Sequence, residues 1–269
     1  MTHTTIPVAL CADDYAQHPG IDAGILALLG LGRLTAVSCF ATSPRWQTVS
    51  APALRAHRAQ ADIGLHFNLT EGFGKPMPSL HAVILRSLLR RLDPADVEQA
   101  LTEQLDAFEA GFGQPPDFID GHQHVHQLPG VREVVLKLIR QRYPGHPVWV
   151  RNTVPADRSW RGKPQVLKLL GGQSLAAALK RARIASNDGF AGVYGFDKAD
   201  YASSFKAWLE RARPGMLIMC HPAAQAYPND EIAQQRVVEY RFFTSPRFDE
   251  MLAATRTSLV RLSRIASNV

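Results

Sequence analysis

The chain has 269 residues, of which 46% are hydrophobic and 20% charged, and its formal net charge is +6. This composition excludes a disordered chain, because disordered chains are poor in hydrophobic residues and rich in charge. The length fits either two domains or one α/β barrel of about 250 residues.

Most of the excess positive charge lies between Arg151 and Ile184, where eight basic residues accompany one acidic residue, Asp157. No zinc-finger or RNP signature occurs with it, so we predict no nucleic-acid partner. A solvated helix surface, or a contact with a partner or an anionic group, explains this segment better.

The cysteines indicate a reducing environment. Cys11, Cys39 and Cys220 are few and scattered, and each lies in an apolar run, as expected for free buried thiols. The start of the chain has no basic region of the kind that signal peptides carry, and the longest apolar stretch is too short to span a bilayer. We therefore expect a cytoplasmic protein without a membrane span.

Short apolar runs alternate with segments whose apolar residues are spaced three and four apart. The predicted strands are Pro7–Ala12, Ala36–Ala41, Ile63–Leu69, Phe118–Ile119 extending to the following histidines, Val148–Val150, Val193–Phe196 and Met216–Cys220. The predicted helices are Ile21–Leu34, Leu80–Leu92, Pro94–Phe112, Val131–Arg142, Val166–Ala185, Ala199–Ala212 and Phe248–Ile265. This alternation predicts an α/β fold with a mostly parallel sheet, open or closed into a barrel. No linker divides the chain, so we predict one domain over residues 1–269.

Two carboxylates, Asp13 and Asp14, directly follow the first predicted strand. On an extended chain they face opposite sides, so one can ligate a metal while the other handles a proton. A turn or a helix cap is the alternative explanation. His66, in the third predicted strand, fits a buried core histidine as well as a metal ligand.

The segment from Asp120 to His126 is the strongest local signal. In an extended conformation Asp120, His122, His124 and His126 all point to one face, and imidazole with carboxylate suits Zn²⁺ and other divalent metals. His221 follows a predicted strand and precedes a proline, which is a good position for a general acid. Arg151, also at a strand end, can pair with a carboxylate such as Asp13 or clamp substrate.

The sequence lacks the other common catalytic motifs. It contains no G-x-S-x-G, H-E-x-x-H, Walker or G-x-G-x-x-G pattern. With these motifs absent, metal-assisted hydrolysis is the catalytic chemistry that the candidate residues favour.

Four motifs occur in order: Ala12-Asp13-Asp14, Gly64 to Thr70 (GLHFNLT), Asp120 to His126 (DGHQHVH) and Cys220-His221-Pro222. Together they resemble the YdjC family of carbohydrate deacetylases, over about Val8 to Pro222. The resemblance implies a single-domain (β/α) barrel-like fold, a distorted TIM-type barrel with its active site at the C-terminal ends of the strands. It also implies one divalent metal ion, Mg²⁺ or Zn²⁺, and hydrolysis of the acetamide of an N-acetylated sugar.

The resemblance also implies roles for individual residues. Asp14, His66 and His122 are the expected metal ligands, with Asp13 as general base and His221 as general acid. The assignment of Asp13 and Asp14 to these two roles rests on analogy with other metal-dependent sugar deacetylases. The remaining expected substrate-binding residues are Arg151, His124 and His126.

Two other functions remain open from the sequence. One is a different metal hydrolase on a similar barrel, an amidohydrolase or a phosphoesterase. The other is a non-catalytic, metal-containing carbohydrate-binding protein, although binding alone does not need both Asp13 and His221. The oligomeric state, monomer or homodimer, is also open.

Overall fold

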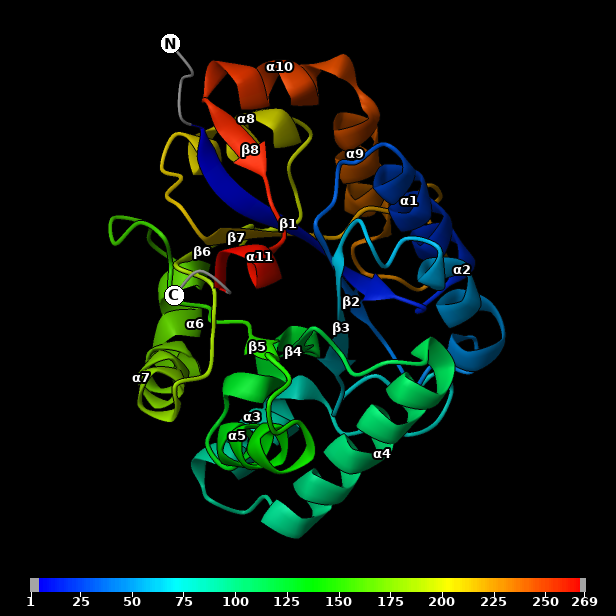
Figure 1. Cartoon of the computed structure of the whole chain (residues 1–269), viewed down its shortest axis with the longest axis vertical. Helices are drawn as coiled ribbons and strands as arrows, with labels where there is room; N and C mark the ends of the chain where they lie inside the picture. Colours follow the sequence, from blue (N-terminus) through cyan, green and yellow to red (C-terminus); the bar gives the residue numbers. More distant parts are fainter. Residues whose placement is uncertain (1–4, 267–269) are drawn as a thin grey trace.

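Seven parallel strands form a curled sheet in the order β5-β4-β3-β2-β1-β7-β6 (Figure 1). The computed structural model describes residues 5–266. The strands are β1 (Ile6–Tyr15), β2 (Ala36–Cys39), β3 (Asp62–Phe67), β4 (Phe118–Gly121), β5 (Trp149–Val150), β6 (Phe190–Ala191) and β7 (Met216–Cys220), and a short β8 (Thr257–Leu259) pairs with β1. A bridge between Pro155 and Phe190 joins the chain after β5 to β6, so the sheet closes into a distorted barrel. The predicted barrel-like α/β fold is confirmed.

The helices lie around the barrel, most of them on its outside. They are α1 (Pro19–Gly30), α2 (Ala51–Arg55), α3 (Leu80–Leu88), α4 (Pro94–Phe112), α5 (Val131–Arg142), α6 (Lys163–Leu167), α7 (Gln173–Ala182), α8 (Tyr201–Leu209), α9 (Ala233–Thr244), α10 (Pro246–Ala254) and α11 (Leu262–Ala266). Three further helical turns are η1 (Trp46–Ser50), η2 (His122–Gln127) and η3 (Lys168–Gly172). In the part of the chain that the structure describes, no helix is long and apolar enough to cross a membrane.

Helices α4 and α5 have the bounds that the sequence predicts. The Asp93 side chain caps α4 by accepting from the amide of Ala95, and Pro94 occupies the first turn, where its missing N–H has no cost. The helix ends at Gly113, whose left-handed backbone (φ 84°) suits a residue without Cβ.

Inward-facing side chains fill the barrel. The buried cluster inside it consists of Ala9, Cys11, Ala36, Phe118, Trp149, Phe190, Leu217, Met219 and Leu262. Leu262 belongs to α11, which lies across the middle of the ring of strands (Figure 1). Phe118 packs on Gly64 of β3 so closely that a Cβ there would lie 2.5 Å from its ring. The interior is therefore apolar up to the ends of the strands, where polar residues begin.

Three predicted elements are displaced or divided where the backbone turns left-handed. The strand predicted at Val193–Phe196 is wrong: β6 lies at Phe190–Ala191, and Gly192 (φ 95°) ends it. Gly171 (φ 137°) divides the helix predicted for Val166–Ala185. Arg256 (φ 52°) ends α10, so the helix predicted for Phe248–Ile265 is replaced by α10, β8 and α11.

Candidate active site

A cleft of about 680 Å³ opens at the C-terminal ends of the strands. Six of the residues predicted from the sequence line it: Asp13, Asp14, His66, His122, His124 and His221. Strand alternation explains part of this arrangement, since residues two apart on a strand face the same side. Asp13 lies two residues after the inward-facing Cys11, and His221 lies two residues after the inward-facing Met219.

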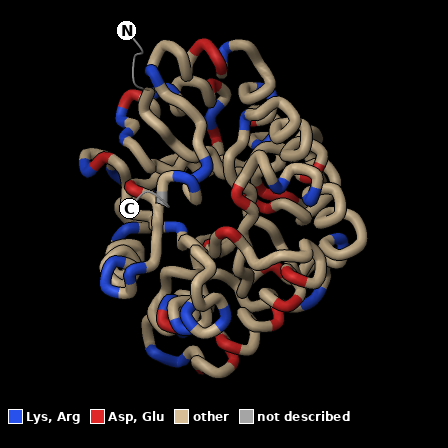
Figure 2. Tube along the Cα trace, viewed as in Figure 1, with Lys and Arg blue, Asp and Glu red and all other residues tan. Residues whose placement is uncertain are grey.

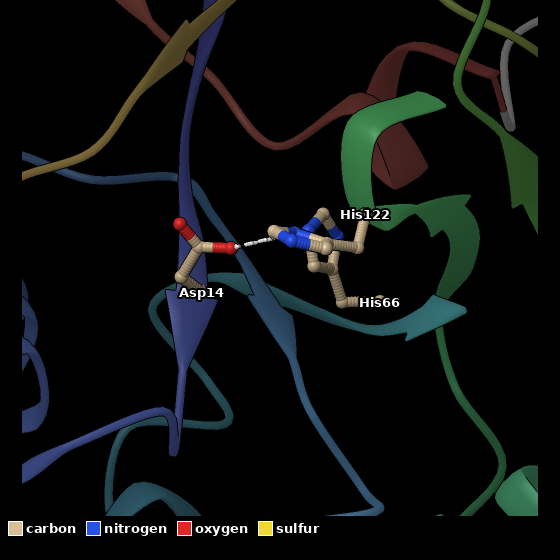
Figure 3. Close-up of side chains that lie close together, drawn as sticks. All are labelled: Asp14, His66 and His122. Carbon is tan, nitrogen blue, oxygen red and sulfur yellow. Dashed lines mark ion pairs between the residues drawn. The ribbon is translucent and has the colours of Figure 1, made fainter. Parts of the chain in front are cut away.

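Asp14, His66 and His122 converge on one point (Figure 3). The Oδ1 atom of Asp14 lies 3.4 Å from Nε2 of His66 and 3.2 Å from Nδ1 of His122. This oxygen is buried and has no hydrogen-bond partner. Burying such an atom is unfavourable unless something binds it, and two imidazole nitrogens with one carboxylate oxygen suit a divalent first-row metal ion. The residues present therefore fit a metal ion.

The backbone at Asp14 aims its side chain into the cleft. Its φ is 67°, and the pairing of β1 with β2 shifts register between Ala12 and Tyr15. Such a bulge redirects a side chain that regular alternation would send to the other face. The prediction that Asp13 and Asp14 face opposite sides is therefore wrong, since both carboxylates line the cleft.

His66 is held by residues behind it. Its Nδ1 lies 2.7 Å from Oδ1 of Asp120, which also accepts from the Ser38 hydroxyl at 2.5 Å. A carboxylate behind a ring nitrogen fixes the tautomer and leaves Nε2 free for a metal. Burial lowers the pKa of His66, but Asp120 and the other nearby carboxylates raise it to about 10. A metal ion at Nε2 must therefore displace a proton.

Arg151 holds Asp13. Its two terminal nitrogens each lie 2.6 Å from an oxygen of Asp13, and Nη2 lies 2.5 Å from Oδ2 of Asp120. The structure thus shows the carboxylate pairing, and the fully buried Arg151 side chain does not fit the predicted contact with substrate. Cys11, Asp13 and Asp120 also cluster closely enough for a metal, but the guanidinium already compensates their charge.

His221 faces Asp13 across the cleft. Its Nε2 lies 4.0 Å from Oδ2 of Asp13, and its backbone amide donates to Oε2 of Glu239 at 2.6 Å. Burial lowers the pKa of His221 to about 4, so its imidazole is neutral at pH 7. A role as proton donor therefore requires that it receives a proton during the reaction.

The extended conformation predicted from Asp120 to His126 is wrong. Gln123 (φ 51°) and His124 (φ 61°) are left-handed, and the segment forms the turn η2. His124 still lines the cleft, but His126 is fully buried and its Nε2 donates to the carbonyl of Arg151 at 2.9 Å. Contact between His126 and substrate does not fit this burial.

Helix α9 contributes residues to the site that the sequence did not predict. Arg236 on this helix places Nη2 2.7 Å from Oδ2 of Asp14 and Nε 2.6 Å from Oδ2 of Asp230. Glu239, one turn further, binds the His221 amide and accepts from the hydroxyl of Tyr194. The helix buries Gln235, Arg236 and Glu239. Because part of its buried face is polar, its sequence does not show the regular spacing of apolar residues that predicts a helix.

Comparison with known proteins gives a family match and similar structures. A family model described as "YdjC-like protein" matches residues 7–254. Chitooligosaccharide deacetylases of Yersinia pestis (strain Pestoides F) and Yersinia pseudotuberculosis (serotype O:1b, strain IP 31758) are each 28% identical over 260 residues, which cover 90% of this chain and 92% of theirs.

Two solved structures share the fold. A protein of Enterococcus faecalis V583, described as a "putative cellobiose-phosphate cleavage protein", has a TM-score of 0.73 at 19% identity, covering 97% of this chain and 99% of its own. The Xyl-CE4 domain of a multidomain xylanase from the hindgut metagenome of Trinervitermes trinervoides has a TM-score of 0.50 at 10% identity, covering 98% of this chain and 91% of its own. At these identities the similarity establishes the fold alone.

Proposed function

The chain belongs to the YdjC-like family, and on this premise we propose that it is a metal-dependent deacetylase that removes the N-acetyl group of an acetylated amino sugar or oligosaccharide. The observation that carries the proposal is the cleft itself. Asp14, His66 and His122 converge there beside Asp13 and His221. The deacetylase names of the Yersinia relatives support an N-acetylated sugar as substrate.

Asp14, His66 and His122 are the residues that would hold the metal ion. Two of the three donors are imidazole nitrogens, which favours Zn²⁺ over Mg²⁺, since Mg²⁺ prefers oxygen ligands. When bound, the ion would polarise the acyl oxygen and lower the pKa of a water molecule.

Asp13 would act as the general base. Arg151 binds both of its oxygens, so the carboxylate keeps one orientation while its Oδ2 faces His221. In the proposed reaction the attacking water loses a proton to Asp13, and the C–N bond of the acetamide then breaks. His221, neutral at rest, receives this proton from Asp13, whose Oδ2 lies 4.0 Å from its Nε2, and delivers it to the departing nitrogen.

The supporting residues act from behind the cleft. Arg151 and His126 are buried positioning residues, while His124 faces the cleft and can contact the sugar. The three cysteines are free and buried, which supports the reducing cytoplasm as the location of the protein.

Measuring acetate release tests the proposal. The purified protein, before and after chelation, is incubated with N-acetylglucosamine and with N-acetylated chitooligosaccharides, and Zn²⁺ or Mg²⁺ is then added back. We expect acetate release that chelation abolishes and metal restores. Full activity of the metal-free protein would overturn the metal mechanism. Saccharide binding without acetate release would support a non-catalytic binding protein, and phosphate release from sugar phosphates would support a phosphoesterase.

A further inference from the structure

Large hydrophobic side chains are exposed mainly in three connections that follow strands. Of nine exposed large hydrophobic residues in the described part of the chain, seven lie between β3 and α4, between β5 and α7, or between β7 and α9. We call these seven the apolar rim: Met77, Leu85, Leu88, Leu89, Val166, Leu169 and Tyr227. Connections from a strand to the next helix lie at the C-terminal end of a β/α barrel, where the active site is. The apolar rim is therefore on the catalytic face.

The same connections border the cleft. Leu80 at the start of α3 and Val166 of α6 both line it, and Asn229 lines it from the connection that carries Tyr227. The exposure is large, since Leu169 is 79% exposed and Leu85 is 59% exposed. Large apolar side chains that are exposed together on one face of a protein indicate an interaction site.

The first two connections are also basic. Residues 77–92 contain Arg86, Arg90 and Arg91, and residues 158–172 contain two arginines and two lysines, while neither segment contains an acidic residue. Figure 2 shows Lys and Arg gathered along α6 and α7. The basic residues within 158–172 belong to the segment between Arg151 and Ile184, for which the sequence alone indicates no definite function. The third connection is acidic instead: Asp230 is paired with Arg236, and Glu231 beside it is exposed and lines the cleft.

We propose that the apolar rim and its basic residues bind the surface of an anionic phospholipid bilayer, with the mouth of the cleft facing that surface. Exposed leucines among arginines and lysines are typical of segments that lie at a membrane interface, where the apolar side chains enter the acyl boundary and the cations bind headgroups. A second copy of this face is disfavoured, because two basic surfaces repel each other.

Vesicle flotation with the metal-loaded, full-length protein tests this proposal. Vesicles of phosphatidylcholine alone are compared with vesicles of phosphatidylcholine and phosphatidylglycerol. We expect binding to the anionic vesicles, weakened by salt, and little binding to the neutral ones. Leu169→Asp and Leu88→Asp should each lower the partition coefficient about tenfold, because an apolar contact is lost and a repelling charge is added.

Matched controls exist at the opposite end of the barrel. Leu31 is 56% exposed in the connection from α1 to β2, so Leu31→Asp should leave vesicle binding unchanged. Arg86→Gln should lower binding about fivefold, whereas Arg58→Gln, in the connection from α2 to β3, should not.

Three outcomes would overturn the proposal. These are absence of binding to anionic vesicles, equal binding of the Leu169→Asp and Leu31→Asp proteins, and a dimer in sedimentation analysis that Leu169→Asp converts to a monomer. Because vesicle binding is measured without substrate, its failure leaves the deacetylase proposal intact. Loss of acetate release likewise leaves the membrane proposal intact.

Discussion

The guanidinium of Arg236 donates to Oδ2 of Asp14 at 2.7 Å, although 222 residues separate the two along the chain. The contact occupies one oxygen of Asp14 and leaves Oδ1 facing His66 and His122. Burial raises the pKa of Asp14, but Arg236 and the two histidines hold it well below its usual value. Arg236 therefore keeps this carboxylate ionised and determines which oxygen faces the other candidate ligands.

Replacing Arg236 by glutamine should destabilise the metal-free protein by about 3–5 kcal/mol, because the buried carboxylate of Asp14 and the partly buried one of Asp230 lose their shared cation. A divalent metal should recover part of this loss, since it neutralises Asp14. Thermal unfolding should therefore show a larger metal-induced rise in Tm for Arg236→Gln than for the wild type. Arg241→Gln, at an exposed position of the same helix, is the control. An equal rise in all three proteins would contradict the prediction.

Much of the fold was predictable because its signals are local. Helices α4 and α5 have buried apolar residues at regular helical spacing, and β7 is a continuous apolar run of the kind that a doubly covered strand requires. The strand β6 was not predictable, because it has two residues and Gly192 ends it beside β7, where a Cβ would lie 2.1 Å from the carbonyl oxygen of Met219.

The site was predictable where it depends on strand ends. Asp13, His66 and His221 meet because the C-terminal ends of parallel strands lie together. Two features of the site depend on packing between distant parts of the chain, so the spacing of residues in the sequence does not predict them. One is the left-handed backbone at Asp14 and His124, and the other is the position of Arg236 beside β1.

Asp13→Asn should separate metal binding from turnover. Asparagine keeps the shape of the side chain but cannot accept a proton as a base, so kcat should fall about 10²–10⁴-fold. The metal content should stay the same, because Asp13 is outside the group formed by Asp14, His66 and His122. Elemental analysis and acetate release measure the two properties. Asp200→Asn, at the exposed cap of α8, is the matched control, and an active Asp13→Asn protein would refute the assignment of the base.

Gly64→Ala should destabilise the barrel by about 1–3 kcal/mol. The added Cβ would lie 2.5 Å from the Phe118 ring, which itself stacks on Trp149 at 4.1 Å between ring centroids. Gly30→Ala is the control, because nothing lies within 4 Å of its Cβ position and alanine favours the helix. Urea unfolding measures both variants. Equal free energies of unfolding for Gly64→Ala and Gly30→Ala would contradict the prediction, because they would show that the barrel interior accommodates the added methyl group.

The affinity for metal should rise with pH. In the metal-free protein the pKa of His66 is raised to about 10, so this ring is protonated at pH 7 and must lose its proton before Nε2 can bind a metal ion. Competition between the proton and the metal predicts an apparent affinity that increases about tenfold per pH unit from pH 6.5 to pH 9. Titration calorimetry in buffers of different ionisation enthalpy should also detect release of about one proton.

The raised pKa of His66 also makes the stability of the metal-free protein depend on pH. A raised folded-state pKa stabilises the protein below the ordinary value of 6.5, and this contribution is lost as the pH rises toward about 10. The metal-free protein should therefore lose stability over that interval, while the metal-loaded protein should lose less. Asp120→Asn removes the carboxylate that raises the pKa of His66, so it should flatten the pH dependence of metal affinity. A wild-type affinity that does not change with pH would exclude a protonated His66 in the metal-free site.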